Sequence, residues 1–367
     1  MKKLFLEDCC EILDSMRVPI TASDRKSGPY PYYGANGIQD YVADYIFDDE
    51  LVLLAEDGGN FGSKTKPIAY RVSGKCWVNN HAHVLKPKES FNVDYLCYSL
   101  MFYNTDGLVN GATRQKLTQA TMRQMLIPQR TYQEQCDTVA QLNKVNLLIK
   151  TRQQQLRKLD ELVKARFVEL FGDPVANEKG WHVELLKDVC NGIGDGLHGT
   201  PEYDEVGAYP FINGNNLTNG TIEITPSTRM VNTETYINHY IEISDNAILL
   251  SINGTLGKLA LYNREKVMLG KSACYCNLRP EINREFVYGV MRTNAFAEFL
   301  ERNATASTIK NVGLKAIRNF RLIVPPDDLQ TEFVTFSRRV DKSKVAVQKS
   351  LDEAQLLFDS LMQQYFG

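Results

Sequence analysis

The sequence lacks the signatures of an enzyme that works with a nucleotide or a methyl donor. It contains no G-x-x-x-x-G-K-[ST] phosphate loop, which excludes a motor of the P-loop class. The run from Gly194 to Gly199 matches G-x-G-x-x-G, but Thr200-Pro201 follows where a helix would have to begin, so no dinucleotide site is expected. Neither a nuclease carboxylate cluster nor a methyl-donor loop can be found. The sequence therefore predicts no catalytic residues and no cofactor.

Metal-binding patterns are also scarce. The eight cysteines show no CxxC spacing, which excludes a zinc ribbon, and we interpret them as small buried apolar side chains. His81 and His83 could together ligate a metal. Because no Cys or carboxylate motif accompanies them, we expect packing and hydrogen bonding from this pair and no metal site.

Long apolar runs and an excess of basic charge are missing as well. No stretch approaches the roughly 20 apolar residues of a membrane span, and the first residues become acidic at Glu7-Asp8, before a signal-peptide core could form. We expect a cytoplasmic protein without a membrane partner. The formal net charge of −2 argues against a uniformly basic nucleic-acid binder, although a local basic face can coexist with an acidic remainder.

What the sequence does contain is an internal repeat. One constant offset carries Val139 onto Val334, and Phe171 onto Phe366. Upstream, the run 31–37 is echoed by 210–215, and Leu53-Leu54 by 249–250. Internal repeats decide the fold and are sought first. The length of this repeat makes each copy a domain followed by a helix.

Each globular part is expected to be a mixed α/β domain. Apolar runs bounded by Gly, Asn and Pro predict strands at 40–43, 51–55 and 82–85, followed by a helix at 93–103. In the second copy the corresponding strand is 249–252 and the helix 286–299. We predict an α+β protein with domains at 1–132 and 184–328, helices at 133–172 and 329–367, and a linker at 173–183.

The two long helices carry apolar residues at a seven-residue spacing, which is typical of coiled coils. Where the first helix has Arg152 and Arg166 in its stripe, the second has Val347 and Leu361 at the equivalent positions, which favours pairing between the unlike helices. We expect an antiparallel pair; the alternatives are parallel pairing, or two helices packed separately on their own domains. The predicted spacer positions are Leu142, Ile149, Leu156, Val163, Leu170, Val340, Val347, Leu351, Phe358 and Leu361.

Matching loops in the two domains have the composition of nucleic-acid contacts. Arg114 has the hydrogen-bonding fork that suits guanine, and Gln115 the one that suits adenine. The alternative is that these loops are ordinary surface turns, because Gly, Asn, Ser and Lys are frequent in all loops. The candidate DNA-binding residues are Asn60, Lys64, Lys66, Asn80, His81, Arg114, Gln115 and Lys116 in the first domain, and Asn253, Lys258, Lys271, Ser272, Thr308 and Lys310 in the second.

Short motifs in a fixed order lie at the junction after the first helix and at the close of each domain. They are Leu170-Phe171-Gly172-Asp173-Pro174, Asn177-x-Lys179-Gly180-Trp181, Leu185 and Asp188, the run 111–117 before Ile127-Pro128 and Gln133-x-Gln135, and Leu314-x-x-Ile317-x-Asn319-Phe320 before Val324-Pro325-Pro326. In this order they resemble the specificity subunit of type I restriction-modification systems, and the resemblance covers essentially the whole chain.

The resemblance implies a non-catalytic subunit with two target recognition domains. Each would read one half of a split, asymmetric site on double-stranded DNA, while the helices fix the spacing between the halves. It also implies docking of two methyltransferase subunits on the helices and recruitment of a translocating restriction subunit. A scaffold, or an inhibitor of methyltransferase subunits, that does not read DNA would have the same fold and is the alternative.

Overall fold

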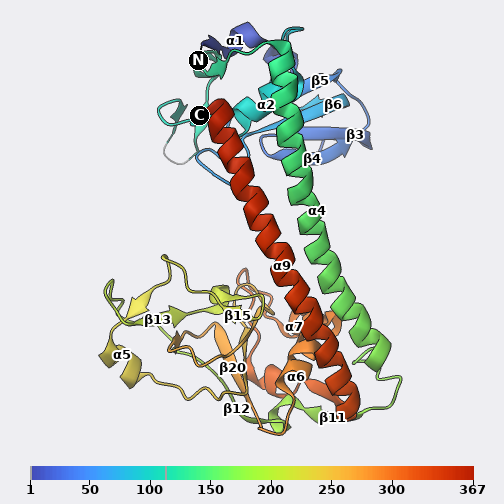
Figure 1. The fold of residues 1–367 in the computed structure, drawn as a ribbon, viewed down its shortest axis with the longest axis vertical. Coiled ribbons are helices and arrows are strands. Elements are labelled where there is room, and N and C mark those ends of the chain that lie inside the picture. The colour runs from blue at the N-terminus through green and yellow to red at the C-terminus, as the bar shows by residue number, and fades with distance from the viewer. Residues whose placement is uncertain (1, 112–113) are drawn as a thin grey trace. The chain divides into compact units, whose positions relative to one another are not determined.

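The structure is a computed structural model that describes residues 2–111 and 114–367. The chain divides into two compact units, Met1–Gln154 together with Gln348–Gly367, and Gln155–Val347. Two helices of 40 residues each, α4 (Tyr132–Phe171) and α9 (Asp327–Phe366), contribute to both units (Figure 1). Each unit is described by itself.

The first unit is built on a six-stranded sheet in the order β2-β7-β5-β6-β3-β4. Its central strand β5 is buried continuously from Leu51 to Ala55, because sheet neighbours pair with both of its edges and apolar side chains pack on both faces. The elements are β1 (Lys3–Phe5), α1 (Leu6–Cys9), β2 (Cys10–Ile12), the 3-10 turn η1 (Asp14–Met16), β3 (Ser27–Gly34), β4 (Gly37–Val42), β5 (Phe47–Ala55), β6 (Ala69–Val78), β7 (Ala82–Pro87), α2 (Val93–Met101), β8 (Val109–Asn110), β9 (Lys116–Leu117), α3 (Gln119–Arg123) and β10 (Leu126–Pro128).

The second unit repeats this plan with shorter strands. Its main sheet has the order β12-β20-β17-β18, beside a small sheet β16-β13-β19. The elements are β11 (His182–Leu185), η2 (Leu186–Asp188), β12 (Cys190–Asp195), β13 (Tyr209–Ile212), η3 (Gly214–Asn216), β14 (Leu217–Thr218), β15 (Thr221–Ile222), β16 (Met230–Val231), α5 (Thr233–Asn238), β17 (Ala247–Ser251), β18 (Leu259–Leu261), β19 (Met268–Leu269), β20 (Ala273–Leu278), α6 (Arg284–Met291), α7 (Asn294–Asn303), α8 (Leu314–Arg318) and β21 (Arg321–Val324).

One predicted helix was wrong in its extent. The segment 286–299 forms two helices, α6 and α7, instead of one. The chain breaks at Thr293, whose side chain accepts a hydrogen bond from the backbone N–H of Phe296 and so caps the start of α7. The helix predicted at 93–103 is α2, which is capped at Asn92 in the same way.

The long helices run antiparallel, as predicted. In the first unit Leu142, early in α4, shares a core with Phe358, late in α9. In the second unit Phe167, late in α4, packs on Phe333, early in α9, with ring centroids 5.4 Å apart. In each unit the two helices lie side by side in opposite directions (Figure 1). The predicted spacer positions are all buried or half-buried.

Polar groups in the helix pair bind across it. In the first unit Arg152 Nε donates to Ser350 Oγ at 3.0 Å. In the second unit Lys344 Nζ lies 2.7 Å from Asp160 Oδ1, and Arg166 pairs with Glu332. Each contact joins two side chains of different type, one from each helix. Such contacts therefore depend on the two helices having different sequences.

No helix among residues 2–111 and 114–367 has both the length and the apolar run that crossing a membrane requires. The cysteines are free, and except for the half-buried Cys136 and Cys190 they are buried, as the sequence predicts. Burial raises the pKa of Cys76 to about 12, so this thiol is held neutral.

Candidate nucleic-acid interface

Three loops of the first unit meet at one end of its sheet. They follow β5, precede β7 and precede β9. Backbone hydrogen bonds join them: Glu56 N–H donates to His81 O at 2.9 Å, and Leu117 N–H donates to Glu56 O at 2.7 Å. Gly58 N–H donates to Gln115 O at 3.3 Å. The three loops predicted to contact nucleic acid therefore form one surface, although Ala112 and Thr113 of the third loop lie outside the described residues.

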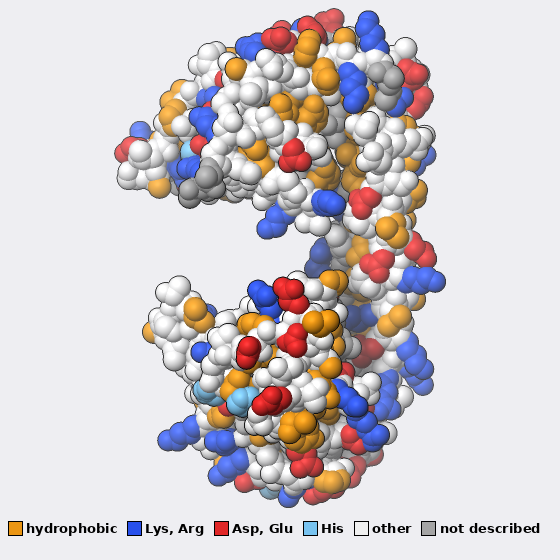
Figure 2. Space-filling view, turned by 90° about the vertical axis from the view of Figure 1, so that its left-hand side faces the viewer, with side chains coloured by type: hydrophobic (Ala, Val, Ile, Leu, Met, Phe, Trp, Pro, Cys, Tyr) orange, Lys and Arg blue, Asp and Glu red, His pale blue; other side chains and the backbone are white. Residues whose placement is uncertain are grey.

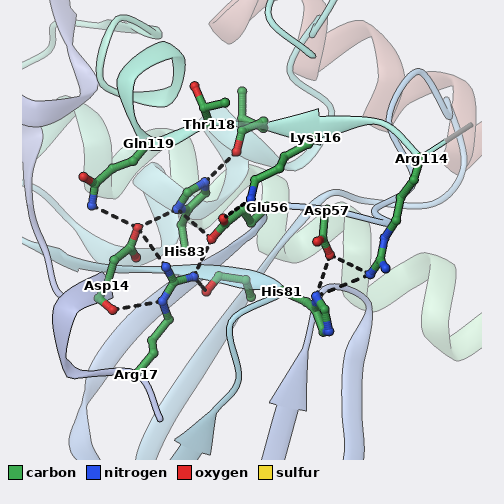
Figure 3. Close-up of polar contacts among 12 residues, drawn as sticks. Asp14, Arg17, Glu56, Asp57, His81, His83, Arg114, Lys116, Thr118 and Gln119 are labelled. Carbon is green, nitrogen blue, oxygen red and sulfur yellow. Dashed lines mark hydrogen bonds and ion pairs between the residues drawn. The ribbon is translucent and has the colours of Figure 1, made fainter. Parts of the chain in front are cut away.

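Arg114, His81 and Asp57 form a polar cluster on this surface (Figure 3). Asp57 Oδ1 accepts a hydrogen bond from Arg114 Nη2 at 2.8 Å and lies 2.6 Å from His81 Nδ1. The Arg114 side chain is 59% exposed, whereas that of Asp57 is 18% exposed. A largely buried carboxylate thus holds one end of an exposed guanidinium group.

A second network lies beside this cluster (Figure 3) and is more deeply buried. Asp14 Oδ2 lies 2.6 Å from His83 Nδ1, and its Oδ1 accepts from the backbone N–H of Val84 at 2.9 Å. Arg17 Nη1 donates to Glu56 Oε2 at 2.6 Å, and Lys116 Nζ lies 3.0 Å from Glu56 Oε1.

The ion pairs of this network lower the pKa of both carboxyl groups. Burial alone would raise the pKa of Asp14, but its hydrogen bond to His83, the charge of that ring and the bond from Val84 bring it below its ordinary value. Burial alone would also raise the pKa of Glu56, but hydrogen bonds from Arg17 and Lys116 outweigh this effect and lower it. Both groups are therefore ionised at neutral pH and fix the base of the loops.

Asp14, Glu56 and His83 could also be read as a metal site, since their ligand atoms all lie within 4.8 Å of one another. Arg17 and Lys116 already neutralise this group, and Gln119 Nε2 donates to Asp14 Oδ2 at 3.1 Å. A dication would have to displace these donors. We therefore interpret the cluster as structural. His81 and His83 bind different carboxylates, so they do not form one ligand set.

The remaining candidate residues of the first domain lie near the same surface or in its flanking loop. Asn60 Nδ2 donates to Asn36 Oδ1 at 3.0 Å, which ties the loop after β5 to the turn after β3. Lys64 and Lys66 are exposed, and neither forms an ion pair with a residue that the structure describes. Asn80 and Gln115 are exposed.

The second unit holds its loops by the same backbone hydrogen bonds. Ile252 N–H donates to Ser272 O at 3.1 Å, Val312 N–H to Ile252 O at 2.9 Å, and Gly254 N–H to Lys310 O at 2.9 Å. Each of these bonds matches one in the first unit. The match assigns equivalent positions in the two domains: Glu56 and Ile252, Asp57 and Asn253, Asn80 and Lys271, His81 and Ser272, Gln115 and Lys310, and Lys116 and Asn311.

The equivalent positions carry different side chains with different partners. Asn253 Nδ2 donates to Asn311 Oδ1 at 3.3 Å, and Ser272 Oγ donates to Asn213 Oδ1 at 2.9 Å. Lys310 pairs with Glu301. Lys258 Nζ donates to a backbone carbonyl at 3.4 Å, while Lys271 and Thr308 are exposed. The shared frame therefore presents two unlike chemical surfaces.

The second unit keeps one pair of this buried network, His198 with Asp195 in the places of Arg17 and Asp14, while Glu56 and His83 have uncharged counterparts. Asp195 is equivalent to Asp14 and lies opposite Cys274 in the sheet. Cys274 therefore takes the place that His83 has in the first unit. With Ile252 in place of Glu56, an open cavity of about 460 Å³ is present there, and its lining includes Asp195, His198, Ile252, Asn311 and Leu314. Ion-paired side chains fill this position in the first domain, and a cavity occupies it in the second.

Charges of both signs are mixed on the face of the molecule that Figure 2 draws. Lys and Arg side chains are interspersed there with Asp and Glu, and hydrophobic side chains are scattered among them. Contacts of this face with a polyanion would come from individual basic residues and not from one continuous basic area.

Several residues of the first unit's surface were missed by sequence reasoning. Asp57 and Glu56 lie in a predicted loop, but nothing in the sequence distinguishes them from other loop acids. Asp14 and Arg17 come from a distant turn. The spacing shared by Asp14-x-x-Arg17 and Asp195-x-x-His198 is the one signal that a comparison of the two repeats could have found.

Comparisons with known proteins point in one direction. The family model described as "Type I restriction modification DNA specificity domain" matches residues 1–160 and 178–354. A putative type I restriction enzyme specificity subunit from Haemophilus influenzae is 42% identical over 123 residues, which cover 34% of this chain and 31% of that protein. This match therefore spans about a third of the relative's length.

Solved structures share the fold over the whole chain. A type I restriction-modification system S subunit from M. genitalium matches with a TM-score of 0.56 at 14% identity, covering 100% of this chain and 96% of the other. A chain from a structure titled for complex assembly and conformational transition of the type I R-M system matches with a TM-score of 0.54 at 15% identity, covering 100% and 97%. At such identities the likeness concerns the fold alone.

Proposed function

The chain belongs to the type I restriction-modification DNA specificity family, and on that premise we propose that it provides the sequence specificity of a type I restriction-modification complex. In this proposal each globular domain is a target recognition domain that reads one half of a bipartite, asymmetric site on double-stranded DNA. The chain contributes no catalytic group or cofactor of its own. Methyl transfer and cleavage are carried out by the other subunits.

The observation that carries this proposal is the shared loop frame with unlike side chains. Matching backbone hydrogen bonds place three loops at the same end of the sheet in both domains. Sequence is read by side chains that reach base edges, whereas contacts to phosphates carry no sequence information. One frame that presents different side chains is what reading two different half-sites requires.

The helix pair supports the proposed spacing and docking roles. The constant offset between the repeats carries the whole of α4 onto the whole of α9, so Leu162 and Leu357 occupy equivalent positions. Their side chains are 47% and 49% exposed. Paired apolar side chains on two related helices suit two copies of one partner. We propose that they are part of the surfaces that bind two methyltransferase subunits, and that a translocating restriction subunit joins the complex through those subunits.

The deciding experiment compares the methylomes of cells that express the cognate methyltransferase subunit with and without this chain. A split, asymmetric methylated motif that appears only with the chain is the expected result. If a stable complex is recovered but no motif appears, the chain is a scaffold or an inhibitor of methyltransferase subunits instead.

A further inference from the structure

Arg114 and Ile309 occupy the same position in the two loop frames. In the first unit the hairpin is closed by the pairs Val109–Leu117 and Asn110–Lys116. In the second unit the bridge Ala304–Val312 corresponds to the pair Val109–Leu117, and each encloses seven residues, 305–311 and 110–116. The bonds from Gly58 and Gly254 to the residue after this position fix the alignment.

We propose that this position determines specificity in both half-sites: Arg114, oriented by Asp57, binds a guanine, and Ile309 packs on the C5-methyl group of a thymine. The inference rests on the proposed function and deepens it. It assigns a base class to each domain and a positioning role to Asp57.

The Asp57 contact argues that Arg114 reads a base and does not neutralise a phosphate. Asp57 Oδ1 takes one N–H of Nη2, and within the described residues no hydrogen bond involves the Nε or Nη1 atoms of Arg114. The neighbouring carboxylate cancels much of the positive charge that a phosphate would require. It leaves intact the planar pattern of donors that matches guanine O6 and N7.

Asp57 is itself firmly held. It lies 2.6 Å from His81 Nδ1, and its backbone forms an isolated bridge with Lys116. A flexible arginine loses rotamer freedom when it binds, and a fixed partner removes part of that loss before DNA arrives. Asp57 is therefore a positioning residue, and its effect should appear in base discrimination.

Ile309 offers a different chemistry at the same point. Its side chain is 64% exposed, and it is the one large apolar side chain of the loop 306–310. The loop is fixed because Ser307 Oγ donates to Ile309 O at 2.6 Å and Asn311 N–H donates to Thr305 Oγ1 at 3.1 Å. The thymine methyl is the apolar group that DNA presents in the major groove. Asn253 and Ser272, in place of Asp57 and His81, leave Ile309 without a charged neighbour at those equivalent positions.

The first test uses the wild-type chain in its complex with methyltransferase subunits and DNA that contains its methylated motif. Replacing one guanine at a time by 7-deazaguanine removes the N7 acceptor. One guanine in one half-site should then lose about tenfold in affinity, the worth of one hydrogen bond to a charged group. Replacing one thymine in the other half-site by deoxyuridine should cost about fourfold, the worth of one buried methyl group.

Variants assign these effects to residues. Arg114→Gln should abolish the 7-deazaguanine effect, and Ile309→Ser the deoxyuridine effect, each leaving the other half-site unchanged. Asp57→Asn should reduce discrimination at the same guanine without moving it. Lys64→Ala is the matched control: it should weaken binding to all sequences equally and leave the motif unchanged.

The outcomes separate the inference from the function beneath it. If the wild-type complex selects a split motif but no base analogue matters, or if the variants keep the wild-type sensitivities, the assignment of Arg114 and Ile309 is wrong and the specificity role stands. If the wild-type complex selects no motif, the proposed function fails.

Discussion

The ring of Phe366, the last residue of α9, lies 5.2 Å from the ring of Tyr95 in α2. Phe171, the last residue of α4, stands in the same relation to Phe286 in α6, also at 5.2 Å. Each long helix therefore ends against the domain of the other repeat. The end of each long helix is thus held by an aromatic contact with that domain.

Removing either terminal ring should loosen one domain and spare the other. Phe171 is fully buried, so Phe171→Ala should cost about 3 to 5 kcal/mol. Phe366 is half-buried, and Phe366→Ala should cost about 2 kcal/mol, within the lower range for core truncations. Hydrogen exchange should rise in α6 for the first variant and in α2 for the second. A rise in the opposite domain would contradict the exchanged packing.

Lengthening both helices together should change the spacing of the two half-sites. Four residues inserted after Gln154 and four after Val347, where the helices pass between the units, add about one turn, or about 6 Å, to each. The methylated motif should keep its half-sites and gain one or two base pairs between them. An insertion in α4 alone should disrupt its register with α9 and impair assembly. Altered half-site bases would mean that the helices themselves read DNA.

The exposed side chains of Leu162 and Leu357 should control how many methyltransferase subunits bind. Leu162→Glu and Leu357→Glu each place a charge in an apolar contact, so each variant should lose one bound methyltransferase subunit. The double variant should bind none. Native mass spectrometry of the purified complex measures this directly. Gln153→Glu adds the same charge at an exposed polar position of α4 and serves as the control. Two bound subunits in the double variant would exclude these side chains from the interface.

The buried network should stabilise the first unit only where its carboxylates are ionised. The pKa of Glu56 lies below its ordinary value of 4.5 and that of Asp14 below 3.8, so their contribution is complete above these values and is lost as the pH falls through the lowered ones. Glu56→Gln should cost about 2 kcal/mol at pH 7, the worth of a hydrogen bond between charged groups.

Thermal melts of this variant from pH 7 to pH 3 provide the check. The difference in stability between Glu56→Gln and the wild-type chain should shrink below pH 4.5. Glu89→Gln, at an exposed position, should melt like the wild-type chain at every pH. A difference that stays constant with pH would mean that packing, and not charge, accounts for the role of Glu56.

The two-domain, two-helix architecture could be predicted because the sequence repeats and its helices carry apolar residues at a regular spacing. Repeated positions such as Phe171 and Phe366 predict two related halves, and the seven-residue stripe predicts the helix pair. The break at Thr293 was not predicted, because a single capping residue inside an apolar stretch does not interrupt the helical period.

The loops of the candidate interface could be proposed from the sequence, but the contacts between them could not. Arg114 is recognisable by its chemistry, but its carboxylate partner Asp57 lies far away in the chain and is brought close by strand pairing alone. The equivalence of Arg114 and Ile309 depends on backbone hydrogen bonds between loops of unlike sequence. An exposed isoleucine becomes informative once its structural counterpart is known.

The division of the chain has a consequence for its biosynthesis. The second unit is one continuous segment, 155–347, whereas the first requires 348–367 in addition to 1–154. A ribosome releases the material of the second unit before it has made the last part of the first. The part of α2 that Phe366 covers, at Tyr95, therefore remains without this contact until the end of α9 emerges. The domain translated first is the one completed last, which makes it the more exposed to chaperones and to aggregation in the nascent protein.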